Sequence, residues 1–297
     1  MPSGVTVCVD PYSTGGELSV ELSSRGYDVV ALWTHECAGL EDHVNANTKK
    51  WIASKGYLAE VKEEEGSLKK TAEALIAACK GKPPLAVLCG GESGVKLCDQ
   101  LTEYMKLRGN GTAGGKWDNR RDKMVQQNAL RDTGVRAVRG LDGVVWEGPI
   151  ASFVDTESFP VVVKPVESAG SEGVKLCKSK KEAEDHFHLL MNSQRAIGSA
   201  GAAVCIQEFL KGTEYVVDQV SKDGEHKTMM VWQYDKRPRN GSQFVYFGAP
   251  GQPPPLAPHS PRSIPPLAAR CRYGAGRPDV GDRPMAHPVH AVCAQRH

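Results

Sequence analysis

The chain is 297 residues long, has a formal net charge of +2, and 24% of its residues are charged. A chain of this length can bury a substantial core and form two or three modest domains. The nearly neutral charge balance excludes a global basic field of the kind that binds nucleic acid through phosphates. Any polyanion must therefore be bound by a local group of cations.

The amino end, MPSGVTVCVD, has no basic region followed by a long apolar one, so it is predicted to be the first strand and not a signal peptide. No run of about 18 apolar residues occurs, which argues against a membrane span. The nine cysteines include no C-x-x-C pair, a usage typical of a reducing compartment. We expect a soluble cytoplasmic protein with no nucleic-acid or membrane partner.

Strand and helix signals alternate in the first part of the chain. Apolar strands are predicted at 5–9 and 27–33, with a helix in STGGELSVELSSRG between them. This β-α-β unit implies a parallel sheet. The acidic, lysine-rich segment 60–82 is predicted to be one solvated helix with an apolar stripe. A further strand at 84–91 ends in a glycine turn.

A helix from about Val95 to Leu107 completes an open α/β lobe of about 110 residues. The glycines of STGG and GGESG follow strands, where exposed amides at a helix start attract anions. Neither stretch matches a GxGxxG or P-loop pattern, which makes a dinucleotide oxidoreductase a distant alternative. We predict an ordinary tight turn at STGG and a cleft-lining position for Glu92.

Three cysteines, Cys8, Cys89 and Cys205, sit inside apolar strand-like runs and are predicted to act as small hydrophobes. The stretches THEC at 34–37 and HFH at 186–188 could supply metal ligands. No second cluster at zinc spacing accompanies them. We interpret both stretches as surface or packing residues.

The character of the sequence changes at residue 109. A glycine-rich stretch leads into a basic helix, with Met124 on its apolar side and Gly134 as its end. Arg120, Arg121 and Lys123 would ordinarily form a solvated face. Only the segments that follow distinguish Lys123 from its neighbours.

In the segment FPVVVKPVESAGSEGVKLC, residues 159–177, a valine strand ends on Lys164. A charge at the end of a buried strand is costly, so it must reach solvent or meet an anion. The loop that follows contains small residues that let backbone amides approach phosphate oxygens: Ser168, Ala169, Gly170, Ser171 and Gly173. This pattern is typical of a polyphosphate site, and a plain β-hairpin turn is the alternative.

Residues 203–224 contain an interrupted strand. It reaches Gln207 and Glu208, breaks at Lys211 and Gly212, and resumes as EYVVDQV with alternating apolar and polar residues. The segment QEFL could present backbone groups to an adenine edge, and a carboxylate a few residues on could bind ribose hydroxyls. The alternative is an exposed hairpin whose acidic residues face water.

The ordered set DK, VVVKP, SAGSEGV and QEFLKGTEY resembles the ATP-grasp superfamily. The preceding lobe is similar to the amino-terminal domain of that family, and GGESGVKLCDQL with RGNGT is similar to its amino-acid ligase and carnosine-synthase-like branch. The resemblance covers about residues 4–248. It implies an α/β amino-terminal domain at 1–112, a partial ATP-grasp α+β domain at 113–248 and a tail at 249–297.

The resemblance also implies roles for the matching residues. Lys123 and Lys164 would contact ATP phosphates, the small-residue loop would close over them, and Glu214 would bind the ribose. The adenine-binding hinge would contain Gln207, Glu208 and Leu210. In the later strands, Lys236 or Arg237 would contact the terminal phosphate or the substrate carboxylate.

The implied reaction is amide or peptide bond formation. Two Mg²⁺ ions would neutralise the β- and γ-phosphates while a substrate carboxylate attacks ATP, and an amine would then displace the acyl phosphate. The expected partners are ATP, a small carboxylate and an amine such as an amino acid. The resemblance makes a homodimer plausible.

After Gly248 the sequence becomes rich in proline, alanine, arginine and histidine, without strand or helix periodicity, which predicts a disordered tail. The magnesium-binding acid and asparagine of the family have no counterpart there, so no metal ligand is assigned. A shifted reading frame or a retained intron would explain the change and implies truncation and impaired catalysis. The alternative is a genuine short form that acts as a non-catalytic nucleotide-binding or partner-binding protein.

Overall fold

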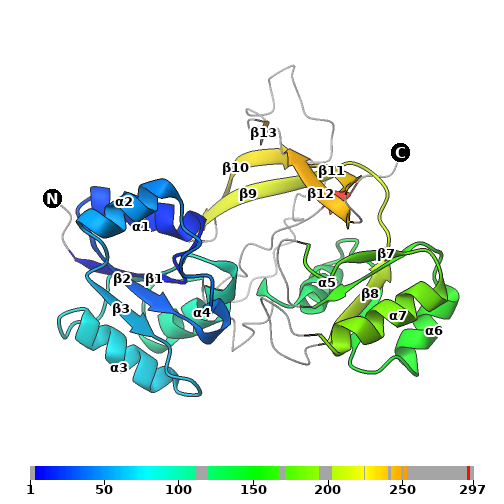
Figure 1. Cartoon of the computed structure of the whole chain (residues 1–297), viewed down its shortest axis with the longest axis horizontal. Helices are drawn as coiled ribbons and strands as arrows, with labels where there is room; N and C mark the ends of the chain where they lie inside the picture. Colours follow the sequence, from blue (N-terminus) through cyan, green and yellow to red (C-terminus); the bar gives the residue numbers. More distant parts are fainter. Residues whose placement is uncertain are drawn as a thin grey trace, which may run out of the picture. The chain divides into compact units, whose positions relative to one another are not determined.

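The structure is a computed structural model. It describes residues 4–110, 120–166, 171–193, 203–223, 225–239, 242–248, 251–252 and 293–294. The chain divides into two compact units, Met1–Phe209 and Leu210–His297. The helices and strands of both units are labelled in Figure 1.

The first unit begins with a parallel sheet, as the sequence predicts; it has four strands in the order β3-β2-β1-β4. Its strands are β1 (Val5–Val9), β2 (Asp28–Trp33), β3 (Ala59–Lys62) and β4 (Ala86–Cys89). The connections contain α1 (Thr14–Ser24), η1 (His35–Cys37), α2 (Ala46–Ser54), α3 (Leu68–Ala78), η2 (Glu92–Gly94) and α4 (Val95–Tyr104), where η1 and η2 are single 3₁₀ turns.

Helices cover both faces of this sheet. Figure 1 shows α1 and α2 on one side of the strands and α3 on the other. Val7 and Leu32 pack with Leu75 of α3 and Leu101 of α4 in one fully buried cluster. Burial on both faces explains why β1 and β2 are mostly apolar rather than alternating.

The predicted helix at 60–82 is wrong at its start. Residues Ala59–Lys62 form β3, which pairs with β2, and they alternate between partly buried and exposed positions. That alternation has the period of a strand. Helix α3 begins only after Ser67, whose side chain accepts a hydrogen bond from the Lys70 N–H.

The rest of the first unit contains an antiparallel sheet of order β5-β8-β6-β7. Its strands are β5 (Gly140–Gly143), β6 (Val161–Pro165), β7 (Lys175–Cys177) and β8 (Val204–Glu208). The accompanying helices are α5 (Lys123–Asp132), α6 (Pro149–Thr156) and α7 (Lys180–Met191). Val163 and Ile206 pack with Ile150 of α6 and Phe187 of α7 in a second buried cluster.

The second unit consists of antiparallel strands. The described ones are β9 (Glu214–Lys222), β10 (Glu225–Gln233), β11 (Asp235–Arg239), β12 (Ser242–Gly248), β13 (Gly251–Gln252) and β14 (Cys293–Ala294). They pair in the order β13-β10-β9-β14, with β11-β12 as a separate hairpin. The predicted break at Lys211 and Gly212 separates β8 from β9. Most of the predicted tail lies outside the described residues.

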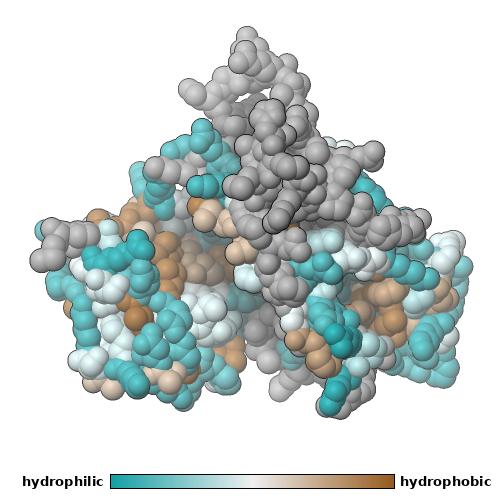
Figure 2. Space-filling model, turned by 90° about the horizontal axis from the view of Figure 1, so that it is seen from above, coloured by the Kyte–Doolittle hydropathy of each residue, from teal (hydrophilic) through white to brown (hydrophobic). Residues whose placement is uncertain are grey.

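Hydrophilic residues alternate with smaller brown, hydrophobic areas on the coloured surface in Figure 2. The exposed large hydrophobic side chains include Leu85, Val145, Leu189 and Val220. Exposed apolar residues of this kind are ordinary on protein surfaces. Within the described ranges, each helix is too short or too polar to span a bilayer.

Candidate functional site

Lys164 lies on the face of the antiparallel sheet that is turned away from α6 and α7. Side chains alternate along β6, so Val161 and Val163 enter the apolar cluster of those helices. Lys164 is paired across the ladder with Cys205, which packs in a separate cluster with Met124 of α5. The strand can therefore carry a lysine without placing its charge in the main core.

Lys123 is the first residue of α5 and is directed toward the end of β6. Its Nζ donates to the Val166 carbonyl at 3.2 Å, and its backbone N–H donates to the same oxygen at 3.3 Å. The Asp122 carboxylate accepts from the N–H groups of Met124 at 2.7 Å and Val125 at 2.9 Å. This N-cap fixes where the helix starts and hence where Lys123 lies.

The structure brings the two predicted phosphate-binding lysines together. Burial in the first place, and the nearby charge of Lys164 in the second, lower the pKa of Lys123 from 10.5 to about 8. A nearby like charge disfavours the charged form of each cation, whereas a bound anion would favour both. The two lysines are therefore suited to a polyanionic ligand.

The small-residue loop is only partly described, because Ser168, Ala169 and Gly170 lie outside the described residues. Ser171 and Gly173 have positive φ values of 65° and 69°. A Cβ atom on Gly173 would lie 2.9 Å from Leu190 Cδ2 and 3.0 Å from Pro165, so close packing adds to the demand for glycine. The Gly173 carbonyl is 2.8 Å from His186 Nε2, which gives this histidine a structural partner.

Glu208, predicted at the adenine hinge, is buried and bound by two arginines. Its carboxylate accepts from Arg136 Nη2 at 2.7 Å, from Arg139 Nη2 at 2.9 Å and from the Arg139 N–H at 3.0 Å. The carboxylate is thus occupied by protein partners, so the end of β8 would have to bind a ligand through its backbone. Gln207 and Leu210 are half-buried.

In the second unit, the predicted ribose acid and one predicted catalytic cation form an ion pair. Lys236 Nζ is 2.6 Å from Glu214 Oε1 and 5.1 Å from the Tyr234 ring centroid. Arg237 pairs instead with Asp235, and its guanidinium carbon is 5.1 Å from the Phe247 ring centroid. The structure therefore joins Glu214 with Lys236 and leaves Arg237 in a different pair.

Arg120 and Arg121 do not form the solvated face that the sequence predicts. The Arg121 side chain is only 4% exposed; its Nη2 donates to Glu36 Oε2 at 2.9 Å and its Nη1 donates to the Glu92 carbonyl. Arg120 pairs with the buried carboxylate of Asp99. The prediction fails because both guanidinium groups find acceptors on the first part of the chain, which spacing along one helix cannot reveal.

Asp10, which sequence reasoning did not single out, is fully buried directly after β1. Its carboxylate accepts from the Thr34 N–H and hydroxyl, both at 2.7 Å, and from the Ser93 hydroxyl at 2.5 Å. Burial raises the Asp10 pKa, while these hydrogen bonds lower it. Asp10 thus links the carboxyl ends of β1, β2 and β4. An acid directly after a parallel strand was the available signal.

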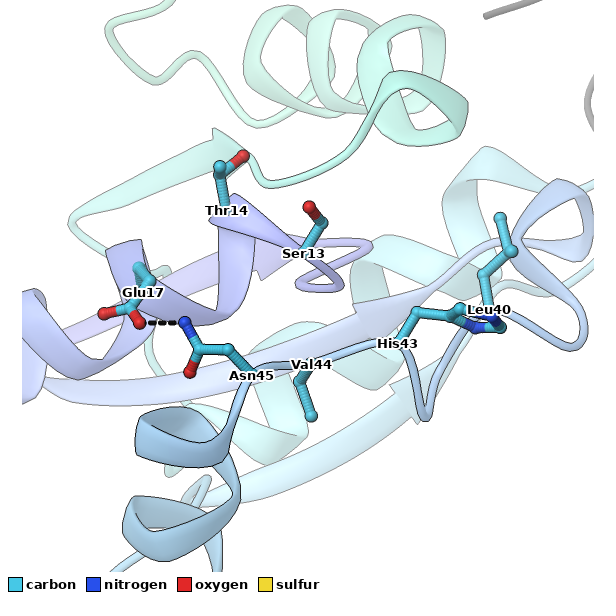
Figure 3. Close-up of a pocket in the computed structure, with 7 residues that line it drawn as sticks. All are labelled: Ser13, Thr14, Glu17, Leu40, His43, Val44 and Asn45. Carbon is cyan, nitrogen blue, oxygen red and sulfur yellow. Dashed lines mark hydrogen bonds between the residues drawn. The ribbon is translucent and has the colours of Figure 1, made fainter. Parts of the chain in front are cut away.

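The STGG stretch forms the tight turn that was predicted. The Gly15 N–H donates to the Tyr12 carbonyl at 2.9 Å, and a Cβ atom on Gly15 would lie 2.4 Å from the Gly90 carbonyl oxygen. An open pocket of ≈ 560 Å³ lies beside this turn (Figure 3). It is lined by Ser13, Thr14, Glu17, Leu40, His43, Val44 and Asn45. These residues do not include any of those predicted to bind ATP.

No group of three or more histidine, cysteine or acidic side chains suited to a metal ion occurs among the described residues. Cys37, in the THEC stretch, packs against Ala31 and Trp33, as a packing residue should. The cysteines between Cys8 and Cys205 are free thiols. Cys8 and Cys205 are buried as predicted, but Cys89 is exposed, because β4 ends there.

Comparison with known proteins shows what this chain is similar to. The sequence profile described as the phosphoribosylglycinamide synthetase ATP-grasp (A) domain matches residues 123–264, which include both lysines. Dapdiamide A synthase of Enterobacter agglomerans is 30% identical over 170 residues, covering 54% of this chain and 39% of the synthase. Residues 123–264 therefore match the ATP-grasp superfamily, as the resemblance in the sequence implies.

Solved structures share this fold. The L-amino acid ligase from Bacillus licheniformis superposes with a TM-score of 0.60 at 15% identity, over 84% of this chain and 55% of the ligase. The N5-carboxyaminoimidazole synthetase from Staphylococcus aureus, complexed with ADP, gives 0.56 at 12% identity, over 79% and 55%. The chain thus spans about half the length of these two proteins and less of the synthase.

Proposed function

We propose that the chain binds ATP with its phosphates against Lys123 and Lys164, as part of an ATP-dependent carboxylate–amine ligase that forms an amide or peptide bond. The observation that carries this proposal is the proximity of the two lysines, one at the start of α5 and one on β6. The match of the ATP-grasp profile across both residues supports it. The L-amino acid ligase and the dapdiamide synthase suggest amino acids as substrates.

The two lysines would act on the phosphate chain through charge. A substrate carboxylate would attack the γ-phosphorus, form a new bond to it and release ADP, which gives an acyl phosphate. An amine would then attack the acyl carbon and release inorganic phosphate. Fixed ammonium groups stabilise the negative charge that spreads over the phosphate oxygens during the first transfer.

Mg²⁺, which the superfamily implies, would neutralise part of the phosphate charge when it is bound with ATP. The described residues contain no cluster of acids that fits such an ion. The contributions proposed for Lys123 and Lys164 do not require one. We propose that turnover by this chain is impaired, because the sequence beyond Gly248 has no counterpart of the family's magnesium-binding acid and asparagine.

Further assignments follow from the ATP-grasp pattern. We propose that the backbone of Gln207, Glu208 and Leu210 meets the adenine, because the Glu208 carboxylate is already bound by arginines. Glu214 would bind the ribose, with Lys236 as its partner. The domain bounds of 1–112, 113–248 and 249–297, a cytoplasmic location and a homodimer belong to the same proposal.

The test is ADP release from Mg-ATP in the presence of mixed amino acids, compared between this chain and its Lys164→Ala variant. Low but measurable release that requires amino acids and disappears in Lys164→Ala is the expected result. Saturable ATP binding without any ADP release would instead favour a non-catalytic nucleotide-binding protein. Release equal in the two proteins would contradict the assignment of Lys164.

A further inference from the structure

Arg121 is a buried charge immediately before the N-cap of the helix that carries Lys123. Its guanidinium contacts two separate turns of the parallel-sheet lobe: Glu36 in η1, which follows β2, and Glu92 in η2, which follows β4. Arg121 Nε also lies 4.0 Å from Glu92 Oε1. A planar guanidinium with donors in a fixed fork can contact both turns at once, which a lysine ammonium cannot do equally well.

The two turns are themselves fixed to each other. The Asp10 carboxylate accepts from Thr34, which precedes η1, and from Ser93, which lies inside η2. Arg121 therefore binds to a pair of strand ends that share one buried acceptor. Its contacts give the chain a defined position just before α5, and they do so at the carboxyl edge of the parallel sheet.

The contacts of Arg121 also fix the place of Lys123, which lies two residues further along the chain. Asp122 caps α5 through two backbone N–H groups, so Arg121 leads directly into a hydrogen-bonded helix start. On the other side, the Lys123 N–H and Nζ both donate to the Val166 carbonyl, just beyond Lys164. Lys123 is thus held between the anchored Arg121 and the end of β6.

We propose that Arg121 is a positioning residue, which holds Lys123 beside Lys164 for phosphate binding by anchoring the start of α5 to the turns after β2 and β4. The inference rests on the proposed ATP-binding function. It assigns Arg121 no contact with ATP, so its effect on nucleotide binding is expected to arise through Lys123.

The test uses Arg121→Ala, Arg121→Lys and, as a matched control, Arg131→Ala. Arg131 is on the same helix, but it bonds to Asn128 and Val138 and not to the parallel-sheet lobe. The first readout is the pH dependence of Lys123 labelling by an amine-reactive reagent, followed on its peptide by mass spectrometry. The charged or titratable groups that influence Lys123 are Lys164, Glu92, Arg121 and Cys205. The second readout is the Mg-ATP dissociation constant from calorimetry.

In Arg121→Ala, the Lys123 pKa is expected to rise from about 8 toward 10.5, because the lysine loses a neighbouring cation and its fixed, partly buried position. The Mg-ATP dissociation constant should increase about tenfold. Arg121→Lys should fall between Arg121→Ala and the unsubstituted protein in both readouts, and Arg131→Ala should change neither.

A lower unfolding temperature in Arg121→Ala, with unchanged Lys123 titration and unchanged Mg-ATP affinity, would overturn the proposal, since it would show a purely structural role. If Arg121→Ala does not fold, the Lys123 titration and the Mg-ATP affinity of Arg121→Lys and Glu36→Gln test the proposal by the same criteria. If the unsubstituted protein binds no Mg-ATP, the proposed function fails, whereas the Lys123 titration still tests the positioning by Arg121.

Discussion

The two sheets of the first unit differ in where their polar side chains lie relative to the strands. In the parallel sheet, the buried polar residues Asp10, Thr34 and Ser93 follow the strands, and Thr34 and Ser93 both donate to the Asp10 carboxylate. In the antiparallel sheet, Lys164 lies within β6, on the ladder itself. A polar group past a strand end can thus be a structural link, whereas a lysine within a strand indicates a face that meets solvent or a ligand.

The difference follows from what covers each sheet. Helices cover both faces of the parallel sheet, so its central strands β1 and β2 are mostly apolar. The antiparallel sheet has one face against α6 and α7, while the start of α5 lies at the other. Lys164 belongs to that second face, where Lys123 also approaches the end of β6.

Removing a core side chain from the apolar face of the antiparallel sheet should lower the free energy of unfolding most. Phe187 is fully buried, and its ring centroid lies 5.6 Å from that of Trp146. Phe187→Ala should lower the free energy of unfolding by about 4 kcal/mol, because it leaves a cavity in the core. Leu189, two residues further on, is 61% exposed and serves as the control. Urea unfolding that shows equal losses for Phe187→Ala and Leu189→Ala would contradict this packing.

Removing the link at the parallel strand ends should have the next largest effect. Asp10→Ala deprives the Thr34 N–H, the Thr34 hydroxyl and the Ser93 hydroxyl of their acceptor, at a cost of about 3 kcal/mol. The exposed acid Asp42 provides a control that should change stability by less than about 0.5 kcal/mol. Thermal and urea unfolding of both variants measure the difference. An unchanged free energy of unfolding in Asp10→Ala would show that these hydrogen bonds do not stabilise the strand ends.

The lowered pKa of Lys123 predicts that Mg-ATP affinity depends on pH. Below pH 8 Lys123 is charged, and above it the free protein loses this proton, so affinity should fall by up to tenfold per pH unit. Stability should change in the opposite direction, rising between pH 8 and 10.5, because the unfolded chain keeps the proton that the folded chain has released. Lys123→Arg, which stays charged, should flatten the binding profile measured by calorimetry. The same pH dependence of Mg-ATP affinity in Lys123→Arg and the unsubstituted protein would exclude Lys123 as the titrating group.

The smallest effect is expected at Lys164, which can be compared with its neighbour Val163 on the other face of β6. Lys164→Met should change the free energy of unfolding by less than about 1 kcal/mol, because the lysine contributes little to the core. Val163→Ala, one residue earlier in a fully buried position, should cost about 2 kcal/mol. Chemical unfolding of both variants tests this. A larger loss from Lys164→Met than from Val163→Ala would mean that Lys164 serves the fold.

Much of the fold could be predicted from local patterns. The strands at 5–9 and 27–33, the helix that follows STGG and the break after β8 all carry periodicity or turn signals that need no distant partner. Helix α7 also begins with a local signal, a serine followed three residues later by a glutamate: Ser179 accepts from the Glu182 N–H, and Glu182 accepts from the Lys178 N–H.

The residues missed at the candidate site depend on contacts between distant parts of the chain. Arg121 meets Glu36 across 85 positions, and Ser93 meets Asp10 across 83. A local pattern assigns such residues to a solvated surface or a turn, because it cannot show which charges meet after folding. Lys123 and Lys164 could be proposed from the sequence, since each occupies a recognisable local context whose order resembles one superfamily.

The most direct test is calorimetric titration of this chain with Mg-ATP, alongside the Lys164→Met variant. We predict saturable binding to the unsubstituted chain and affinity at least about tenfold weaker in Lys164→Met, because a charge-assisted phosphate contact is lost. Circular dichroism spectra and urea midpoints that match between the two proteins would assign the loss to the site. No binding by the folded, unsubstituted chain, or equal affinity in the two proteins, would contradict the claim that the paired lysines bind ATP.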